Sequence, residues 1–193
     1  MASDRILLIT GPAGAGKSSV AEAWAASRDF ACAQLSLDTF REFVKAGYHD
    51  PRNGWNDEAQ RQLDLARSNM AAVTIIYLRS GVQVVIDDAV FPNWDTGGLD
   101  GWNEALPGVS IDLVVLMPDW NVVLERNGGR DGQRRVPEDV LRIIYDDMAG
   151  WRDKAGVSVI DNSGMTIADT VAAVERVVGA LQRGVLAAVF GAA

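Results

Sequence analysis

The chain is poor in the residues that cross-link or anchor a protein. It has one cysteine, Cys32, and one histidine, His49, among 193 residues. A single cysteine excludes an internal disulfide, and we therefore expect an intracellular, cytoplasmic protein. The apolar run 5–10 is too short for a signal peptide, and 71–78 falls far short of the about 20 residues that a membrane helix needs. We expect no membrane association.

Positive charge is also scarce. The sequence has 18 lysines and arginines against 26 aspartates and glutamates, which gives a net charge of −8. Nonspecific binding to nucleic acid or to an anionic membrane needs a positive field, so this balance argues against both. The exception is a local cluster of arginines, Arg126, Arg130, Arg134 and Arg135.

Apolar runs alternate with helical periodicities along a chain whose length fits one domain over residues 1–193. The runs do not alternate with polar residues, which is typical of parallel strands covered on both faces. They are 5–10, 82–87, 111–117 and 157–160, with a weaker one at 32–37. The pattern predicts an α/β domain with helices on both faces of a sheet. The apolar tail 183–193 receives no assignment, and the sequence makes no prediction about the oligomeric state.

The segment between the first strand and the first helix reads GPAGAGKSS and contains the spacing G-x-x-x-x-G-K-[ST]. Glycine lets the backbone curl, so that its N–H groups and the start of the following helix face phosphate oxygens. Lys17 would reach the β- and γ-phosphates, and the Ser18 hydroxyl would bind Mg²⁺. We expect ATP and Mg²⁺ to be held by this segment, which comprises Gly11, Pro12, Ala13, Gly14, Ala15, Gly16, Lys17, Ser18 and Ser19. The alternative, a glycine-rich turn that binds nothing, fits its place between strand and helix less well.

Several classes of phosphate-loop protein are disfavoured. A guanine-reading N-K-x-D motif does not occur, and larger ATPases need elements for which 193 residues leave little room. A small kinase needs an acceptor-activating carboxylate after the second strand, an acidic residue for Mg²⁺ after the third, and an arginine-bearing lid. The sequence has all three in that order. A nucleotide-gated switch without an acceptor remains the non-enzyme alternative.

Asp38, in LSLDTFRE, is the candidate for the first of these features. A carboxylate there lies at the carboxyl edge of the sheet, where α/β proteins bind ligands, and would act as general base on an acceptor hydroxyl. The same position suits a helix N-cap, and one aspartate can do both.

Asp87 and Asp88, in VVIDDAVF, follow the third strand. One of them would support Mg²⁺ and the other would position the acceptor, and we favour Asp87 for the metal. The alternative is that one of the pair only caps the loop.

The predicted lid spans residues 126–137, where Arg126, Arg130 and either Arg134 or Arg135 lie among glycines. Closure would bring guanidinium groups onto the transferring phosphoryl group and exclude water. The alternative is a solvated charged loop.

Aromatic residues gather in two segments, with Tyr48 and Trp55 in the first and Phe91, Trp94 and Trp102 in the second. They would either stack on a planar acceptor or cover the sheet edge as part of the core, and the sequence favours neither.

Five stretches resemble small P-loop kinases, a group that includes chloramphenicol phosphotransferase and the 5′-kinase domain of polynucleotide kinases. They are GPAGAGKSS, DTFRE, VVIDDAVF, RNGGRDGQRRVPEDVLRIIYDDM and VIDNSGMT. The resemblance implies a three-layer fold with about five parallel strands in the order 2-3-1-4-5. It also implies that Asp38 is the base, that Arg41 binds an acceptor phosphate, and that Arg126 acts in the lid with Arg130 beside it. Asn162 and Ser163 would border the adenine. Segments 47–56 and 91–102 match neither family.

The sequence therefore predicts an ATP- and Mg²⁺-dependent phosphotransferase that acts on a hydroxyl of a small molecule, such as an antibiotic or a metabolite. The net acidity and the two adjacent aspartates favour that acceptor. The alternative acceptor is the 5′-hydroxyl of a polynucleotide, which Arg41 and the lid resemblance favour. Nucleic acid is thus expected only as an acceptor.

Overall fold

The computed structural model describes residues 5–95, 97–132 and 134–190, with side chains up to residue 183. Five strands form one parallel sheet in the order β2-β3-β1-β4-β5, which confirms the expected order. The strands are β1 (Arg5–Thr10), β2 (Cys32–Ser36), β3 (Gln83–Asp87), β4 (Ser110–Leu116) and β5 (Ser158–Ile160).

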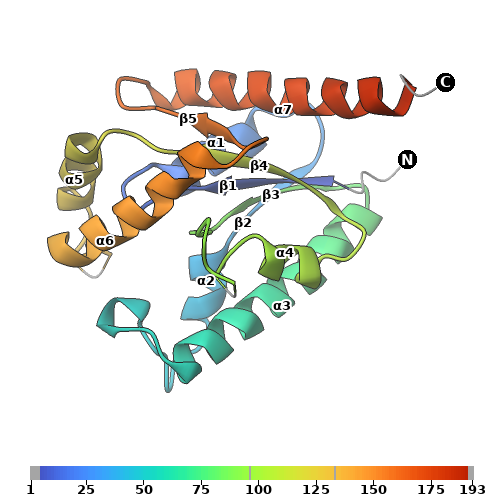
Figure 1. Cartoon of the computed structure of the whole chain (residues 1–193). Coiled ribbons are helices and arrows are strands. Elements are labelled where there is room, and N and C mark those ends of the chain that lie inside the picture. The colour runs from blue at the N-terminus through green and yellow to red at the C-terminus, as the bar shows by residue number, and fades with distance from the viewer. Residues whose placement is uncertain (1–4, 96, 133, 191–193) are drawn as a thin grey trace.

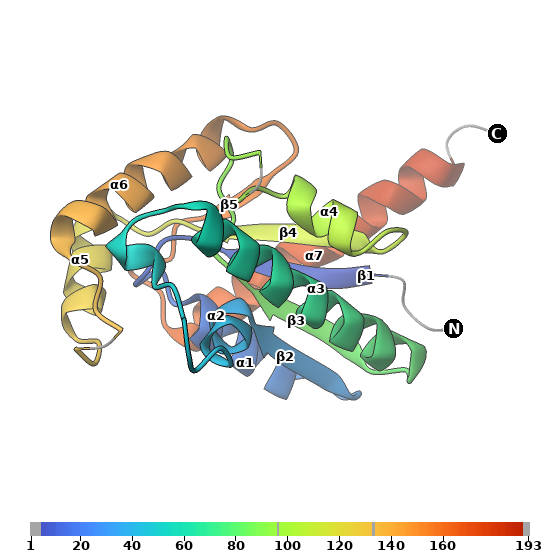
Figure 2. The ribbon, with the colours of Figure 1, turned by 90° about the horizontal axis from the view of Figure 1, so that it is seen from below.

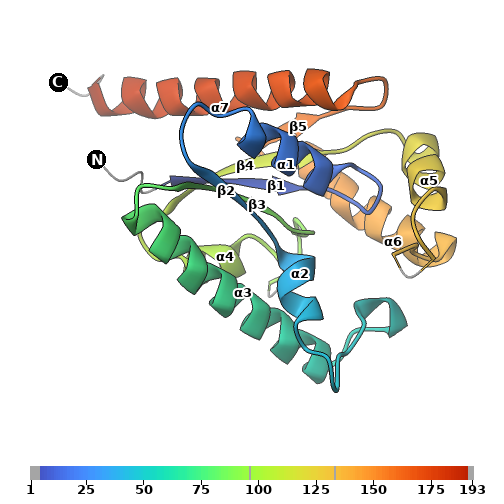
Figure 3. The ribbon, with the colours of Figure 1, turned by 180° about the vertical axis from the view of Figure 1, so that it is seen from behind.

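Helices cover both faces of the sheet, as the three-layer expectation required (Figures 1 and 3). Helices α1 (Lys17–Ala26) and α7 (Ile167–Phe190) pack on one face. The remaining helices and turns lie toward the opposite face. These are α2 (Leu37–Glu42), the 3-10 turn η1 (Pro51–Asn53), α3 (Asp57–Arg79), α4 (Asp100–Ala105), α5 (Trp120–Gly128), α6 (Glu138–Ala149) and the 3-10 turn η2 (Gly150–Asp153).

The alternation of side chains along β1 separates two cores. Ile6 and Leu8 belong to the core under α3 and α6, while Leu7 and Ile9 belong to the core under α1 and α7. All four are at most 3% exposed, which is why the run reads as continuously apolar in the sequence.

The strand register brings the carboxyl ends of β1, β2 and β3 together. Asp87 pairs with Ile9 on one side and with Ser36 on the other. The loops that follow these strands therefore open at one edge of the sheet. The connection between α5 and α6 lies at this edge (Figure 1), and the predicted lid begins within α5, because Arg126 is in the last turn of that helix. Strand β1 begins and α7 ends on the opposite side of the molecule (Figures 1 and 2).

Local signals set the helix boundaries. Helix α3 begins at Asp57 because the Asn56 side chain accepts a hydrogen bond from the Ala59 backbone N–H, at 2.9 Å. In α6, Pro137 precedes a first turn that carries Glu138 and Asp139. No helix among the described residues is long and apolar enough to cross a bilayer.

Candidate functional site

The loop between β1 and α1 is shaped by glycines that no other residue replaces without strain. Gly11, Gly14 and Gly16 have φ values of 148°, 86° and 90°. A Cβ atom on Gly11 would lie 2.1 Å from the carbonyl oxygen of Leu116, and one on Gly14 would lie 2.7 Å from that of Val123. The loop is thus packed tightly against the end of β4 and against α5, and it leads directly into α1.

Lys17 folds back over this loop. Its ammonium donates hydrogen bonds to the backbone oxygens of Gly11, at 2.9 Å, and Pro12, at 3.2 Å. Burial lowers the pKa of Lys17 below its usual range, and the carboxylates of Asp38 and Asp87 oppose that effect. The loop therefore places one cation within the electrostatic influence of Asp38 from α2 and Asp87 from β3.

Asp87 lies at the end of β3, is 3% exposed and accepts three side-chain hydrogen bonds. Ser18 Oγ donates to its Oδ1 at 2.7 Å, and Ser36 Oγ donates to the same oxygen at 3.1 Å. Gln34 Nε2 donates to Oδ2. Burial raises the pKa of Asp87, while these donors and Lys17 lower it. The structure brings together Ser18 and Asp87, the two residues expected to bind the metal.

Gln34 and Ser36 belong to this site, although the sequence analysis did not identify them. They lie two residues apart on β2, so their side chains project from the same face of the sheet. Both are polar residues in an otherwise apolar run, and this was the signal available in the sequence.

Asp88 is 7% exposed, and its carboxylate is bonded to core residues that Asp87 does not contact. The Asp88 Oδ2 accepts from the indole Nε1 of Trp102 at 2.8 Å and from Nη2 of Arg67 at 3.3 Å. Arg67 comes from α3, is 3% exposed, and also donates to the backbone oxygen of Gly97 at 3.3 Å. Arg67 was not predicted as a site residue, although a charged residue on the apolar face of α3 was a signal in the sequence.

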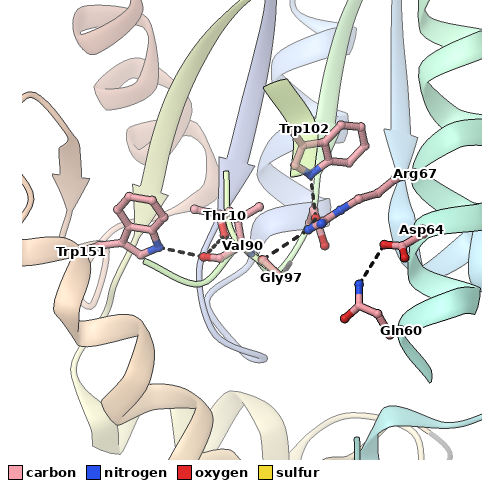
Figure 4. Close-up of polar contacts among 9 residues, drawn as sticks. Thr10, Gln60, Asp64, Arg67, Val90, Gly97, Trp102 and Trp151 are labelled. Carbon is pink, nitrogen blue, oxygen red and sulfur yellow. Dashed lines mark hydrogen bonds and ion pairs between the residues drawn. The ribbon is translucent and has the colours of Figure 1, made fainter. Parts of the chain in front are cut away.

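The same loop is fixed at a second point (Figure 4). The Val90 N–H donates to Thr10 Oγ1 at 2.8 Å, and its carbonyl accepts from Trp151 Nε1 at 2.8 Å. The segment 88–99 is therefore held to β1, to α3 and to η2.

Asp38 is exposed in the first turn of α2, whose N-cap residue is Ser36. Asp38 is therefore not the cap itself, although a carboxylate in a first turn favours the helix dipole. Its charge acts on Lys17 and on the lid residue Arg130. The Asp38 charge thus acts both on the phosphate-binding loop and on the connection between α5 and α6.

Arg41, one turn further along α2, is 7% exposed. Its Nε and Nη2 atoms have no hydrogen-bond partner among the described residues. The guanidinium carbon lies 5.9 Å from the ring centre of Trp55. A buried guanidinium with unbonded N–H groups is costly, so Arg41 is suited to bind an anion.

The arginines of residues 126–137 differ in their surroundings, and Gln133 lies outside the described residues. Arg126 Nη2 donates to the backbone oxygen of Asn162 at 3.2 Å. Burial lowers the pKa of Arg130, and the nearby Asp38 raises it. Arg134 and Arg135 are exposed.

Asn127 joins the two ends of this segment. Its side chain donates to the Val136 carbonyl at 2.8 Å and accepts from the Val136 N–H at 3.0 Å. These two bonds join the end of α5 to the residues that precede α6.

Asn162 and Ser163 follow β5. The buried Asn162 donates from Nδ2 to the backbone oxygen of Ala15 at 3.0 Å, which supports the phosphate-binding loop from the side. Ser163 Oγ accepts from the Asp119 N–H at 2.7 Å and donates to the carboxylate of Asp161.

The aromatic residues separate into core and surface. Trp102 is fully buried and Phe91 is 9% exposed, so both belong to the core. Trp55 remains 40% exposed, and its ring meets that of Trp94 edge-on at 5.7 Å between centres. Trp94 in turn stacks on Phe91 at 4.1 Å. The two segments that match neither family therefore contact each other beside Arg41.

The described residues contain no group of three histidine, cysteine or acidic side chains arranged to hold a metal ion. Within this described part of the chain, the candidate of the expected kind is the Ser18–Asp87 pair. Such a sparse set suits Mg²⁺, which takes one or two protein ligands and completes its shell with phosphates and water.

The fold is similar to that of several solved structures, whose names describe different proteins. A gluconokinase from Sinorhizobium meliloti 1021 is 19% identical with a TM-score of 0.66, over 96% of this chain and 98% of that one. The tunicamycin resistance protein of Deinococcus radiodurans is 19% identical with a TM-score of 0.62, over 93% and 95%. A chain of the Pnkp1/Rnl/Hen1 RNA repair complex is 17% identical with a TM-score of 0.56, over 77% and 45%. No curated protein sequence matches significantly.

The sequence also matches a family model. The family described as "AAA domain" (AAA_33) matches residues 6–155. This range contains the phosphate-binding loop, Asp38, Asp87, Asp88 and the lid segment. Together with the sheet order and the solved neighbours, it confirms the expected resemblance to P-loop kinases. The chain belongs to the AAA_33 family of AAA domains and has a P-loop kinase fold.

Proposed function

We propose that the protein is an ATP- and Mg²⁺-dependent kinase that transfers the γ-phosphoryl group to a hydroxyl of a small molecule. The observation that carries the proposal is the convergence of Lys17, the Ser18–Asp87 pair and Asp38 at one edge of the sheet. Donor and acceptor chemistry need these groups side by side.

On the donor side, the N–H groups of residues 11–19 and the Lys17 ammonium bind the phosphates of ATP. The Ser18 hydroxyl and the Asp87 carboxylate would hold Mg²⁺, directly or through water. The ion would supply positive charge that offsets the charge of the phosphates. Asn162 and Ser163 border the adenine, and Asn162 also supports Ala15 of the loop.

On the acceptor side, Asp38 takes the proton of the attacking hydroxyl. Arg130 and Arg126 stabilise the charge on the transferred group, and the charge of Asp38 acts on Arg130. Asp88 positions the acceptor through the loop 88–99, because Arg67 and Trp102 fix its carboxylate.

A second acceptor class is the 5′-hydroxyl of a polynucleotide. The observation that favours it is Arg41, whose buried Nε and Nη2 atoms lack partners among the described residues. A phosphate next to the reacting hydroxyl would satisfy them.

The experiment that tests the proposed function is phosphoryl transfer from γ-labelled ATP. We would compare a 5′-hydroxyl oligonucleotide with a panel of hydroxylated antibiotics and metabolites. Transfer to a panel member alone supports a small-molecule kinase, and transfer to the oligonucleotide supports the second class. Nucleotide binding without acceptor-dependent ADP formation contradicts both and favours a nucleotide-gated switch.

Asp38→Asn tests the base. We expect kcat to fall about 10²- to 10⁴-fold, the usual contribution of a positioned general base, while ATP affinity stays close to that of the parent protein. Glu42→Gln is the matched control, because Glu42 is an exposed carboxylate on the same helix. Equal turnover in Asp38→Asn would remove Asp38 from this role.

A further inference from the structure

A cavity of about 240 Å³ lies at the amino ends of the strands. The phosphate-binding loop lies at the carboxyl ends, which form the opposite edge of the sheet. The cavity is bounded by the starts of β1, β3 and β4 and by helices α1 and α7, which share one face of the sheet (Figure 3). Leu7 lines the cavity, and the rest of β1 separates it from Gly11 of the loop by about 13 Å at the usual strand rise. The proposed kinase chemistry therefore leaves this cavity unused.

The cavity contains a buried hydrogen-bond donor without a partner. Trp24 lines it and is 5% exposed, and its indole Nε1 makes no hydrogen bond among the described residues. Buried polar atoms are nearly always bonded in folded proteins, so an unbonded indole N–H beside a cavity indicates a missing acceptor.

The charged groups around the cavity neutralise one another. Arg5 forms an ion pair with Asp112, and Arg28 forms one with Glu175. Burial raises the pKa of Asp112, and Arg5 lowers it. Two cations and two anions therefore leave no net charge for an ionic ligand such as a nucleotide phosphate.

Gly179 provides part of the space. It lies within α7, where glycine weakens a helix relative to alanine, and it lines the cavity. A Cβ atom there would meet only the end of the Arg183 side chain, at 3.4 Å. A larger side chain at this position would extend into the cavity while remaining compatible with the helix.

We propose that this cavity is a second binding site, for a small, neutral, planar molecule that presents a carbonyl or ring-nitrogen acceptor to Trp24. The size supports a ligand of one or two rings, because the volume lies between the about 150 Å³ that admits benzene and the about 300 Å³ of drug-sized pockets. Phe30 and the edge of Trp24, whose ring also lies 4.5 Å from the Arg28 guanidinium carbon, provide aromatic surface, and Gln83 and Gln182 add amide groups.

The test uses ligand-detected saturation-transfer NMR on the full chain, with benzamide and benzoate as probes. The two have the same ring, but only benzamide is neutral. We expect benzamide to bind the parent protein and benzoate to bind at least about tenfold more weakly, because the lining has no unpaired positive charge to offset desolvation of a carboxylate.

Variants locate the binding. Gly179→Leu should abolish benzamide binding by filling the cavity, and Gly179→Ala should keep it. Trp24→Phe, which removes only the N–H donor, should weaken it about two- to tenfold, as for one neutral hydrogen bond. Lys17→Ala should leave it unchanged, because that residue is at the other edge of the sheet. Circular dichroism confirms that each variant is folded.

Three results would overturn the proposal. These are no benzamide signal with the folded parent protein, an undiminished signal in Gly179→Leu, and a signal lost in Lys17→Ala. If Trp24→Phe bound benzamide as tightly as the parent protein, the indole N–H would not donate a hydrogen bond to the ligand. None of these measurements depends on kinase activity, so the two proposals fail separately.

Discussion

The charge on Asp87 is balanced between burial and three hydrogen-bond donors. Burial favours the protonated acid, and Ser18, Gln34 and Ser36 favour the carboxylate. Burial is the largest of these effects, so the pKa of Asp87 lies above that of an exposed aspartate. Kinase activity that depends on this carboxylate should therefore decline as the pH falls through the raised pKa.

Gln34→Met removes one donor and keeps the volume. The pKa of Asp87 should rise further, so the acid limb of the kcat/KM profile for ATP should move to higher pH. In the acid limb, kcat/KM should fall about tenfold or more relative to the parent protein, the effect of one hydrogen bond to a charged group. Ser36→Ala, which removes a longer bond, should cause a smaller shift. An unchanged acid limb in both variants would exclude this role for Gln34.

We expect Asp88 to stabilise the fold through its ion pair with Arg67. Asp88→Ala leaves Arg67 without its carboxylate in the core and should lower the free energy of unfolding by about 3–5 kcal/mol in urea denaturation. Asp95→Ala, an exposed position in the same loop, should change it by less than about 0.5 kcal/mol. Full stability of Asp88→Ala would show that the pair with Arg67 does not hold the loop.

At the scale of elements, the unit of β1, loop and α1 depends on backbone geometry that one methyl group disrupts. Gly11→Ala would place its Cβ 2.1 Å from a backbone oxygen, so either the loop or β4 must move. We expect ATP affinity to fall at least about tenfold, because misplaced loop N–H groups no longer match the phosphates.

Gly108→Ala is the matched control for that variant. Gly108 also has a positive φ, of 80°, but a Cβ there meets nothing within 4 Å. It tests backbone strain alone, and isothermal titration should show unchanged ATP affinity. Normal ATP affinity in Gly11→Ala would mean that the loop adapts and that its packing on β4 is dispensable.

The elements were largely predictable, and the contacts between them were not. Buried strands are recognisable because apolar runs record burial on both faces, and the phosphate-binding loop is recognisable because its glycines are sterically required. The bonds of Gln34 to Asp87 and of Arg67 to Asp88 depend on strand register and helix packing. Strand register and helix packing bring together residues that are far apart in the chain, so local patterns in one sequence do not reveal these bonds.

At the scale of the whole molecule, net charge affects which acceptor binds well. A chain of charge −8 repels a polyanion, so only local arginines would hold an oligonucleotide, and salt would screen them. For a neutral small acceptor, KM should change less than about twofold between 50 and 200 mM salt. For an oligonucleotide it should rise steeply. Steady-state assays at several salt concentrations distinguish the two.

The exposed Trp55 ring has an optical consequence. It lies beside Arg41 and Trp94, where an acceptor is proposed to bind, whereas Trp24, Trp102 and Trp151 are each at most 5% exposed. An acceptor that covers Trp55 would remove it from water and shift its emission to shorter wavelength, over a constant background from the buried indoles. If the acceptor binds there, Trp55 would report its binding by fluorescence, with no added label.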